Sequence, residues 1–319
     1  MHMSHYGMRA SRSRWWSLLV ALGALVLGAK DGNTEPAGHG ATAQGSFSLL
    51  TYNVAGLPIF ISQSEPTRNM PEIGSLLNLY DVALVQEDFA YHDALNTRAK
   101  HTYRSPPLVP DAKVGIGDGL NVFSRLPFTR FERVSWRACN GRFSDGSDCL
   151  APKGFTFEEE ELTPGVSIDL YNLHMDSGDA ERDVSARALQ AEQLLSFIDR
   201  HSADHAVIVA GDTNMGRESE SILERFMKVA RLTDACRTLS CRWPNLIDRV
   251  MYRGSSELTL RATQFAIDDR FVREDGRNLS DHRAIGVVIQ WTREERMARP
   301  ESAKPRVSRS PLVVPRPPT

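Results

Sequence analysis

Apolar residues along the middle of the chain recur with two different spacings. Alternating or continuous apolar runs predict strands over 47–54, 82–85, 120–124, 206–210, 248–252, 258–263 and 284–290. The runs 154–162 and 166–173 alternate on either side of Thr163-Pro164-Gly165, which predicts a hairpin. Apolar residues spaced three and four apart predict helices over 70–79 and 179–200. Because strands outnumber helices, the pattern favours an α+β fold, a mainly antiparallel two-sheet β-sandwich flanked by helices, over a doubly wound parallel sheet.

The N-terminal segment has the order of residues found in export signals. Three arginines precede an apolar run over 15–29, and small residues follow it. We therefore expect residues 1–43 to be a signal peptide and leader, cleaved after the small residues at 41–43 or near Ala29. A short uncleaved anchor is the alternative, because the apolar run is shorter than the ~20 residues that span a membrane.

Composition and charge separate a globular middle from the two ends. The chain has 319 residues, of which 41% are hydrophobic and 24% charged, and this excludes collagen-like, coiled-coil and wholly disordered proteins. Residues 293–319 are rich in Pro, Arg and Ser, so we expect a disordered tail there and one domain over 44–292. The ends carry +2 and +4, which leaves −8 for the middle out of a total of −2. Such an acidic domain is unlike a polyanion-binding surface, and its carboxylates could hold a cation.

Four cysteines form two local groups, Cys139 with Cys149 and Cys236 with Cys241. Two short-range pairs suit an oxidising compartment, and of the three possible connectivities proximity favours the two local disulfides. A zinc site is disfavoured because neither group has CxxC spacing or a histidine at ligand spacing. We therefore expect a secreted, periplasmic or cell-surface protein.

Polar residues able to bind a cation or move a proton stand repeatedly at the ends of predicted strands. They are Asn53, Glu87, His174, Asp212, Asn214, Asp248, Asp281 and His282. Each alone is most simply a turn or structural residue, but side-by-side strands would bring them together on one rim. Carboxylate and amide oxygens without thiols suit a hard cation such as Mg²⁺. A histidine beside carboxylates can act as a base, with an aspartate fixing its tautomer.

In this order the motifs resemble the endonuclease/exonuclease/phosphatase superfamily, whose fold is the deoxyribonuclease I-like four-layer sandwich. The similar stretches cover 46–291 and are Leu49-Leu50-Thr51-Tyr52-Asn53-Val54, Val85-Gln86-Glu87, Leu173-His174, Gly211-Asp212-Thr213-Asn214, Ile247-Asp248-Arg249-Val250 and Ser280-Asp281-His282-Arg283-Ala284. The resemblance implies that 44–292 is a catalytic domain.

The same resemblance implies a role for each residue. Glu87 would be the principal ligand of Mg²⁺, or of Mn²⁺ or another divalent cation, assisted by Asn53 and Asp281. His282 would be the general base, oriented by Asp248. His174 would stabilise the transition state, and Asp212 and Asn214 would bind the phosphoryl group. Arg249 departs from the pattern, since relatives often carry Tyr after the aspartate.

Two local features resemble secreted neutral sphingomyelinases. The stretch 148–154 resembles the segment before their central hairpin, which implies that Lys153 and Asp148 bind substrate; a disulfide-tethered loop with a solvated lysine is the alternative. The stretch 53–58 is also common among them and continues into the apolar Ile59-Phe60-Ile61, which could enter a lipid surface or pack inside.

These features predict a secreted Mg²⁺-dependent phosphodiesterase that acts on a sphingomyelin-type phospholipid at a membrane surface, by in-line attack of water. A secreted endonuclease or exonuclease acting on nucleic acid is the second hypothesis. A catalytically silent surface-binding module of the same fold is the third, disfavoured because Glu87, Asp212, Asp248 and His282 are all present. The sequence shows no sign of an obligate protein partner.

Overall fold

The computed structural model describes residues 43–60, 62, 64–108, 116–142, 148–243 and 245–293. The predicted export signal and the predicted tail lie almost wholly outside the described residues, so the boundaries of the domain remain predictions. No helix among the described residues is long and apolar enough to cross a bilayer.

In the described part of the chain, twelve strands form two six-stranded sheets with the orders β11-β12-β1-β2-β4-β3 and β5-β6-β7-β8-β10-β9. The first sheet contains β1 (Ala43–Asn53), β2 (Val82–Gln86), β3 (Tyr103–Arg104), β4 (Asn121–Ser124), β11 (Leu258–Ile267) and β12 (Ile285–Arg293). The second contains β5 (Phe128–Ser135), β6 (Gly154–Thr163), β7 (Val166–His174), β8 (Val207–Asp212), β9 (Thr233–Asp234) and β10 (Asp248–Arg253). The pairings are antiparallel except β1 with β2 and β7 with β8. The mainly antiparallel two-sheet prediction is confirmed.

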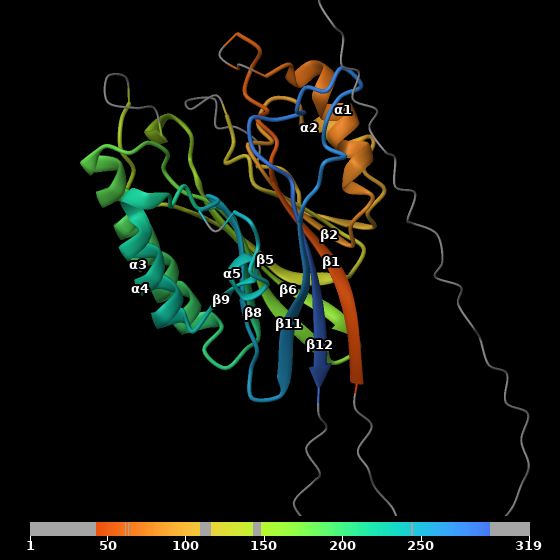
Figure 1. The fold of residues 1–319 in the computed structure, drawn as a ribbon, viewed down its shortest axis with the longest axis vertical. Coiled ribbons are helices and arrows are strands. Elements are labelled where there is room, and N and C mark those ends of the chain that lie inside the picture. The colour runs from red at the N-terminus through yellow and green to blue at the C-terminus, as the bar shows by residue number, and fades with distance from the viewer. Residues whose placement is uncertain are drawn as a thin grey trace, which may run out of the picture. The chain divides into compact units, whose positions relative to one another are not determined.

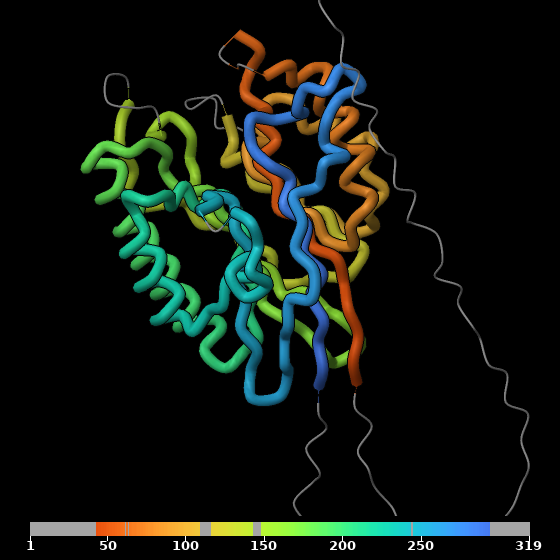
Figure 2. The backbone as a smooth tube through the Cα atoms, in the orientation of Figure 1, coloured from red at the N-terminus to blue at the C-terminus, as the bar shows by residue number. Residues whose placement is uncertain are grey.

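Helices cover the outer faces of both sheets and complete four layers (Figure 1). They are α1 (Pro66–Leu77), α2 (His92–Asn96), α3 (Glu181–His201), α4 (Glu220–Ala230) and α5 (Ala235–Thr238), with the 3₁₀ turns η1 (Asp148–Leu150) and η2 (Arg217–Ser219). Helices α1 and α2 pack on the first sheet, and α3 and α4 pack on the second. The first and last strands of the two sheets lie side by side, because β12 pairs antiparallel with β1 along the whole length of β12 (Figure 2).

Several elements of the described structure were not predicted, and the two longest of them are β5 and α4. Strand β5 pairs with β6, but a bulge between Thr129 and Glu132 and the left-handed backbone of Arg130 (φ 52°) break its alternation. Helix α4 carries apolar residues at helical spacing, among them Leu223, Phe226 and Met227, so its pattern was present in the sequence. Helix α1 begins at Pro66, four residues before the predicted start, because Pro is favoured in a first turn.

The inner faces of the two sheets change from apolar to polar towards one edge. Alternate residues of five strands face the other sheet, and their rows read Phe47-Leu49-Thr51-Asn53, Val82-Leu84-Gln86, Ile168-Leu170-Asn172-His174, Ile208-Ala210-Asp212 and Tyr252-Val250-Asp248. The apolar members form one core cluster between the sheets. The strand pairings bring the polar ends to a common rim.

Two glutamates of β6 are buried between the sheets. Glu158 and Glu160 are both 0% exposed, and the hydroxyl of Ser124 donates to Glu160. Both carboxylate oxygens of Glu158 lack a hydrogen-bond partner among the described residues. Burial raises the pKa of Glu158 well above its usual range, and the charge of Glu160 adds to the rise. Burial also raises the pKa of Glu160, to about 8. Both groups are therefore mainly protonated at neutral pH.

Glu160→Gln should change how stability depends on pH. The pKa of Glu160 is about 8 in the folded protein against 4.5 for the free side chain. Ionisation in the unfolded chain therefore removes stability as the pH rises from 4.5 to 8. Relative to the unmodified protein, the free energy of unfolding of the variant should rise by about 2–4 kcal/mol between pH 5 and pH 8. Urea denaturation at the two pH values measures this change.

Ser124→Ala is the matched control for this prediction. It removes the hydrogen bond to Glu160 but keeps the buried carboxyl group, so the loss of stability with rising pH should persist. If Glu160→Gln leaves the pH dependence of unfolding unchanged, Glu160 is already ionised in the folded protein and the assignment is wrong.

Candidate active site

Five strand ends supply the polar groups of the rim. Asn53 ends β1 and Glu87 follows β2, while His174 ends β7, Asp212 ends β8 and Asp248 begins β10. Asp212 lies between two neighbours in the second sheet, since it pairs with His174 on one side and with Asp248 on the other. The strand pairing alone therefore brings three predicted residues together.

The amide of Asn53 joins the two sheets at this rim. Its Nδ2 donates to Glu87 Oε1 (3.0 Å) and to Asp212 Oδ2 (3.1 Å), and lies 3.4 Å from His282 Nε2. Its Oδ1 accepts from the backbone N–H of Ala55, so in this arrangement the amide nitrogen faces Glu87. Glu87 itself has a left-handed backbone (φ 57°), which for a residue with a Cβ persists only where its surroundings hold it.

His282 and Asp248 form a close pair. Nδ1 of His282 lies 2.9 Å and 3.1 Å from the two carboxylate oxygens of Asp248, while Nε2 points to Asp212 Oδ2 at 3.6 Å. Burial alone would lower the pKa of His282, but the hydrogen bond to Asp248 and the charges of Asp212, Asp248 and Asp281 outweigh it and raise the pKa to about 10. Asp248 therefore fixes the orientation of the ring and leaves Nε2 facing the rim.

His174 and Asp212 are almost completely buried. Nε2 of His174 lies 3.4 Å from Asp212 Oδ2 and 3.9 Å from Glu87 Oε1. Burial lowers the pKa of His174 well below its usual range, and the positive charges of Lys153 and His282 lower it further, so the ring is neutral. Burial raises the pKa of Asp212, and Asp248 adds to the rise.

The donor set of the rim fits a hard divalent cation. Burial raises the pKa of the Glu87 carboxyl, as it does for Asp212, so both carboxylates lack full compensation of their charge. Ligand atoms of Asp212, Asp248 and His282 also lie within 4.8 Å of one another. Oxygen donors predominate and no thiol lies among them, which suits Mg²⁺ or Mn²⁺.

Comparison with known sequences assigns the chain to a family. Residues 50–282 match the sequence model of the Endonuclease/Exonuclease/phosphatase family. The chain belongs to this family. Its matched segment contains the whole rim, from the strand that ends at Asn53 to His282.

The proteins to which the chain is similar include a sphingomyelinase and a protein solved in complex with DNA. The chain is 36% identical over 263 residues to a sphingomyelinase of Mycobacterium bovis, covering 76% of this chain and 52% of that protein. The chain thus spans about half the length of the curated relatives it matches. Its fold is similar to beta toxin of Staphylococcus aureus with bound magnesium ions (TM-score 0.57, 16% identity, 76% of this chain and 99% of that one). It is also similar to D. rerio TDP2 complexed with a single-stranded DNA product (TM-score 0.58, 18% identity, 76% and 98% covered).

In this family member, Lys153 and Asp148 form a buried ion pair beside the rim. The ammonium donates to Asp148 and, at 3.3 Å, to the carbonyl of Met175, and Ser177 donates its hydroxyl to the same carboxylate. Lys153 is 10% exposed, so the solvated-lysine alternative is wrong. Its charge lowers the pKa of both Glu87 and Asp212, although burial dominates each.

Both local disulfides are present, Cys139–Cys149 and Cys236–Cys241. The first ends in η1, next to Asp148, and so ties the loop of Asp148 to the preceding segment.

The remaining predicted residues lie at the edge of the rim. The backbone of Asn214 is left-handed (φ 49°); its N–H donates to Asp212 Oδ1, and its amide donates to Met175 O. Asp281 is exposed, and its Oδ1 lies 3.2 Å from the hydroxyl oxygen of Ser280. Arg249 points away from the rim and pairs with buried Asp234 at 2.9 Å.

Ser280 has a role in the site that was not predicted from the sequence. Its hydroxyl donates to the backbone carbonyl of Asn53 (2.7 Å) and accepts from the N–H of His282 (3.2 Å). Ser280 thus ties the loop of His282 to the end of β1. Its position directly before Asp281-His282 was the available signal.

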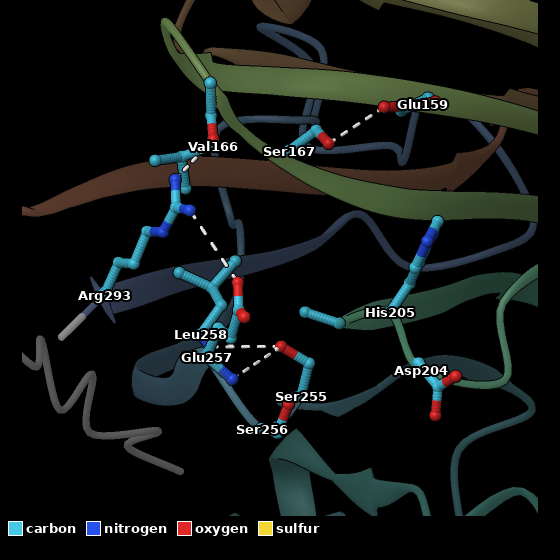
Figure 3. Close-up of a pocket in the computed structure, with 12 residues that line it drawn as sticks. Glu159, Val166, Ser167, Asp204, His205, Ser255, Ser256, Glu257, Leu258 and Arg293 are labelled. Atoms are coloured by element: carbon cyan, nitrogen blue, oxygen red, sulfur yellow. Dashed lines mark hydrogen bonds and ion pairs between the residues drawn. The ribbon is translucent and has the colours of Figure 1, made fainter. Parts of the chain in front are cut away.

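A separate pocket of about 360 Å³ lies at the opposite ends of the strands (Figure 3). Its lining includes Gly165 of the β6–β7 turn, Ala206 before β8 and Arg293 at the end of β12. There, Arg293 faces Glu257 and lies apart from His205 (Figure 3). None of the predicted site residues lines this pocket.

Asp248→Asn should lower the pKa of His282. The amide keeps an acceptor for Nδ1 but removes the negative charge, so the pKa should fall from about 10 to about 9 or lower in the metal-free protein. A pH titration of the histidine ring signals by NMR measures it. Asp281→Asn is the control. It removes an exposed charge that has a smaller effect on the pKa of His282 than Asp248 has, so it should lower this pKa less. Equal effects of the two substitutions would argue against the pairing.

Proposed function

We propose that the protein is an exported, divalent-metal-dependent phosphodiesterase that hydrolyses a sphingomyelin-type phospholipid. The observation that carries the proposal is the convergence of Asn53, Glu87, His174, Asp212 and His282 within hydrogen-bond or ion-pair distance at one rim. The 36% identity with a sphingomyelinase of Mycobacterium bovis supports a phospholipid substrate.

Glu87 would hold the metal, with Asn53 and Asp281 beside it. The bound cation would neutralise charge on the nonbridging phosphoryl oxygens. Glu87 has its carboxylate at the rim, 20% exposed, so it can reach both solvent and the buried groups. Asn53 would orient this carboxylate through the hydrogen bond that its amide already makes.

His282 would take the proton of the attacking water at Nε2. Asp248 holds Nδ1, so only Nε2 is directed to the rim. A base must be neutral, and the pKa of about 10 keeps the ring protonated in the metal-free protein. A divalent cation beside the rim would lower this pKa, because it opposes the carboxylate charges that raise it.

His174, Asp212, Asn214 and Lys153 would meet the phosphoryl group. The neutral ring of His174 can donate one hydrogen bond to an oxygen that gains charge in the transition state. Lys153 is held beside the rim by Asp148 and supplies a fixed positive charge. The position of these donors is set before substrate arrives, which is what electrostatic stabilisation requires.

Charge and surface both favour a lipid over nucleic acid. Residues 44–292 carry −8, whereas nucleic-acid binding normally relies on clustered Lys and Arg. Ile59 and Phe60 follow the Asn53 end of β1 and are 56% and 83% exposed, so they offer an apolar surface beside the rim. A nuclease remains the second candidate, because the similar TDP2 fold holds a single-stranded DNA product.

Action outside the cytoplasm is supported by the two disulfides in the described residues and by the export-type pattern at 1–43.

A parallel assay of three substrates tests the proposal. The purified protein is given sphingomyelin vesicles, phosphatidylcholine vesicles and plasmid DNA, each with Mg²⁺ and with chelator. We expect release of phosphocholine from sphingomyelin, dependent on Mg²⁺, without cutting of DNA. His282→Ala should lower the rate at least a few hundredfold, because it removes a group that acts in the transition state.

His205→Ala is the matched control for this assay. His205 also pairs with an aspartate, Asp169 at 2.8 Å, but lies in the pocket at the other end of the sandwich. It should leave the rate unchanged. DNA cutting without lipid hydrolysis would replace the lipid proposal with the nuclease, and absence of both activities would favour the silent module.

A further inference from the structure

The candidate active site is divided between two sheets. Asn53 and Glu87 belong to the end of the first sheet, and His174 and Asp212 to the second. The separation of Glu87 Oε1 from His174 Nε2, 3.9 Å, therefore depends on how the two sheets are held against each other. The sheets meet mainly through apolar side chains, whose attraction is non-directional and does not by itself fix a sliding position.

Directly beneath the site the contact between the sheets is polar. Gln86 is the last residue of β2 and precedes Glu87, and Asn172 stands two residues before His174 in β7. Both side chains are 0% exposed. Asn172 is therefore one step along the inner face from His174, and Gln86 is next to Glu87 in the chain.

Their amides connect the two sheets by hydrogen bonds. Gln86 Nε2 donates to Asn172 Oδ1 (2.7 Å) and to Thr51 Oγ1 (3.1 Å). Asn172 Nδ2 donates to the carbonyls of Val85 (3.0 Å) and Asn121 (3.3 Å) in the first sheet. Because carbonyls only accept, the orientation of the Asn172 amide is determined, and with it that of Gln86.

The same contact lies where the pairing of β2 with β4 ends. Val85 and Asn121 are the final pair of that ladder, and Glu87 then takes its left-handed backbone. The carbonyls of Gln86 and Glu87 accept from the N–H groups of Val54 and Gly56. Asn172 thus holds the first sheet just before the backbone turns to present Glu87.

We propose that Gln86 and Asn172 are positioning residues that lock the two sheets together beneath the site and so fix Glu87 against His174. The buried Oε1 of Gln86 lacks a hydrogen-bond partner among the described residues, an arrangement that an apolar side chain would avoid. The polar pair of Gln86 and Asn172 is therefore better explained by the position in which it holds the two sheets than by a gain in the free energy of unfolding. The effect on turnover rests on the proposed phosphodiesterase activity, whereas the effect on the site itself does not.

The test is the double variant Gln86→Met, Asn172→Leu, together with Gln86→Met alone, which keeps the hydrogen bonds of Asn172 to the carbonyls of Val85 and Asn121. Replacing both partners by apolar groups of similar size leaves stability less affected than removing one. The matched control is Tyr171→Phe, which deletes the buried hydrogen bond between Tyr171 Oη and Ser202 Oγ (2.6 Å) on the other face of the same strand.

Three measurements separate positioning from stability. In the clamp variants (Gln86→Met and the double variant), Mn²⁺ and Mg²⁺ should bind at least about tenfold more weakly, and the amides of Val54 and Gly56 should exchange at least about tenfold faster. With sphingomyelin vesicles, kcat should fall at least about tenfold with a smaller change in KM, since misplacement of about 1 Å can cost a hundredfold. Tyr171→Phe should change Tm by about as much as the clamp variants do, but it should leave metal affinity, amide exchange and kcat unchanged.

Wild-type metal affinity and amide exchange in the clamp variants would overturn the proposal. Losses of metal affinity and amide protection in Tyr171→Phe equal to those in the clamp variants would also overturn the proposal, because such losses would follow from reduced stability alone. If the unmodified protein hydrolyses no phosphodiester, the proposed function fails, but metal affinity and amide exchange still decide whether Gln86 and Asn172 position the site.

Discussion

The fit of two inner sheet faces is the constraint on which the rest of the structure depends. In a strand, alternate residues face the same side, so a slip of one residue would turn every inner side chain outward. The apolar members of each row fix the register because they must be buried together. The polar members at the row ends, among them Asn53, His174 and Asp212, are carried to the rim by that same register. The packing of the core therefore also places the polar side chains of the site at the rim.

This coupling explains why much of the site could be predicted from sequence. Each of Asn53, His174 and Asp212 closes a short apolar run, and a polar residue at the end of a run is visible without any structure. The order of the runs was sufficient to indicate the family, because its motifs coincide with strand ends. The sandwich itself followed from many short strands with few helices. The sequence therefore predicted which residues reach the rim.

The contacts within and below the rim could not be predicted, because they join residues far apart in the chain. Gln86 and Asn172 are separated by 86 positions, and the sequence predicted no role for either side chain, although Gln86 directly precedes Glu87. The acidic run that contains Glu158 and Glu160 resembles a solvated strand, yet two of its members face the core. The resemblance implied that Lys153 and Asp148 bind substrate, whereas the burial of their ion pair depends on how η1 folds back. The alternation of β5 was hidden by its bulge.

The electrostatics of the rim follow from the same burial. Glu87 and Asp212 are removed from water, which raises the pKa of both carboxyl groups, while three aspartates raise the pKa of His282 to about 10. Burial is the main cause of the shift in the two carboxyl groups, whereas burial opposes the shift in His282, which the hydrogen bond to Asp248 and the neighbouring carboxylate charges produce. A positive ion beside Glu87 would relieve both, since it favours ionised carboxylates and a neutral imidazole. Without a cation, burial makes this arrangement of carboxylates costly. With a cation bound, the same arrangement is the one that phosphodiester hydrolysis needs.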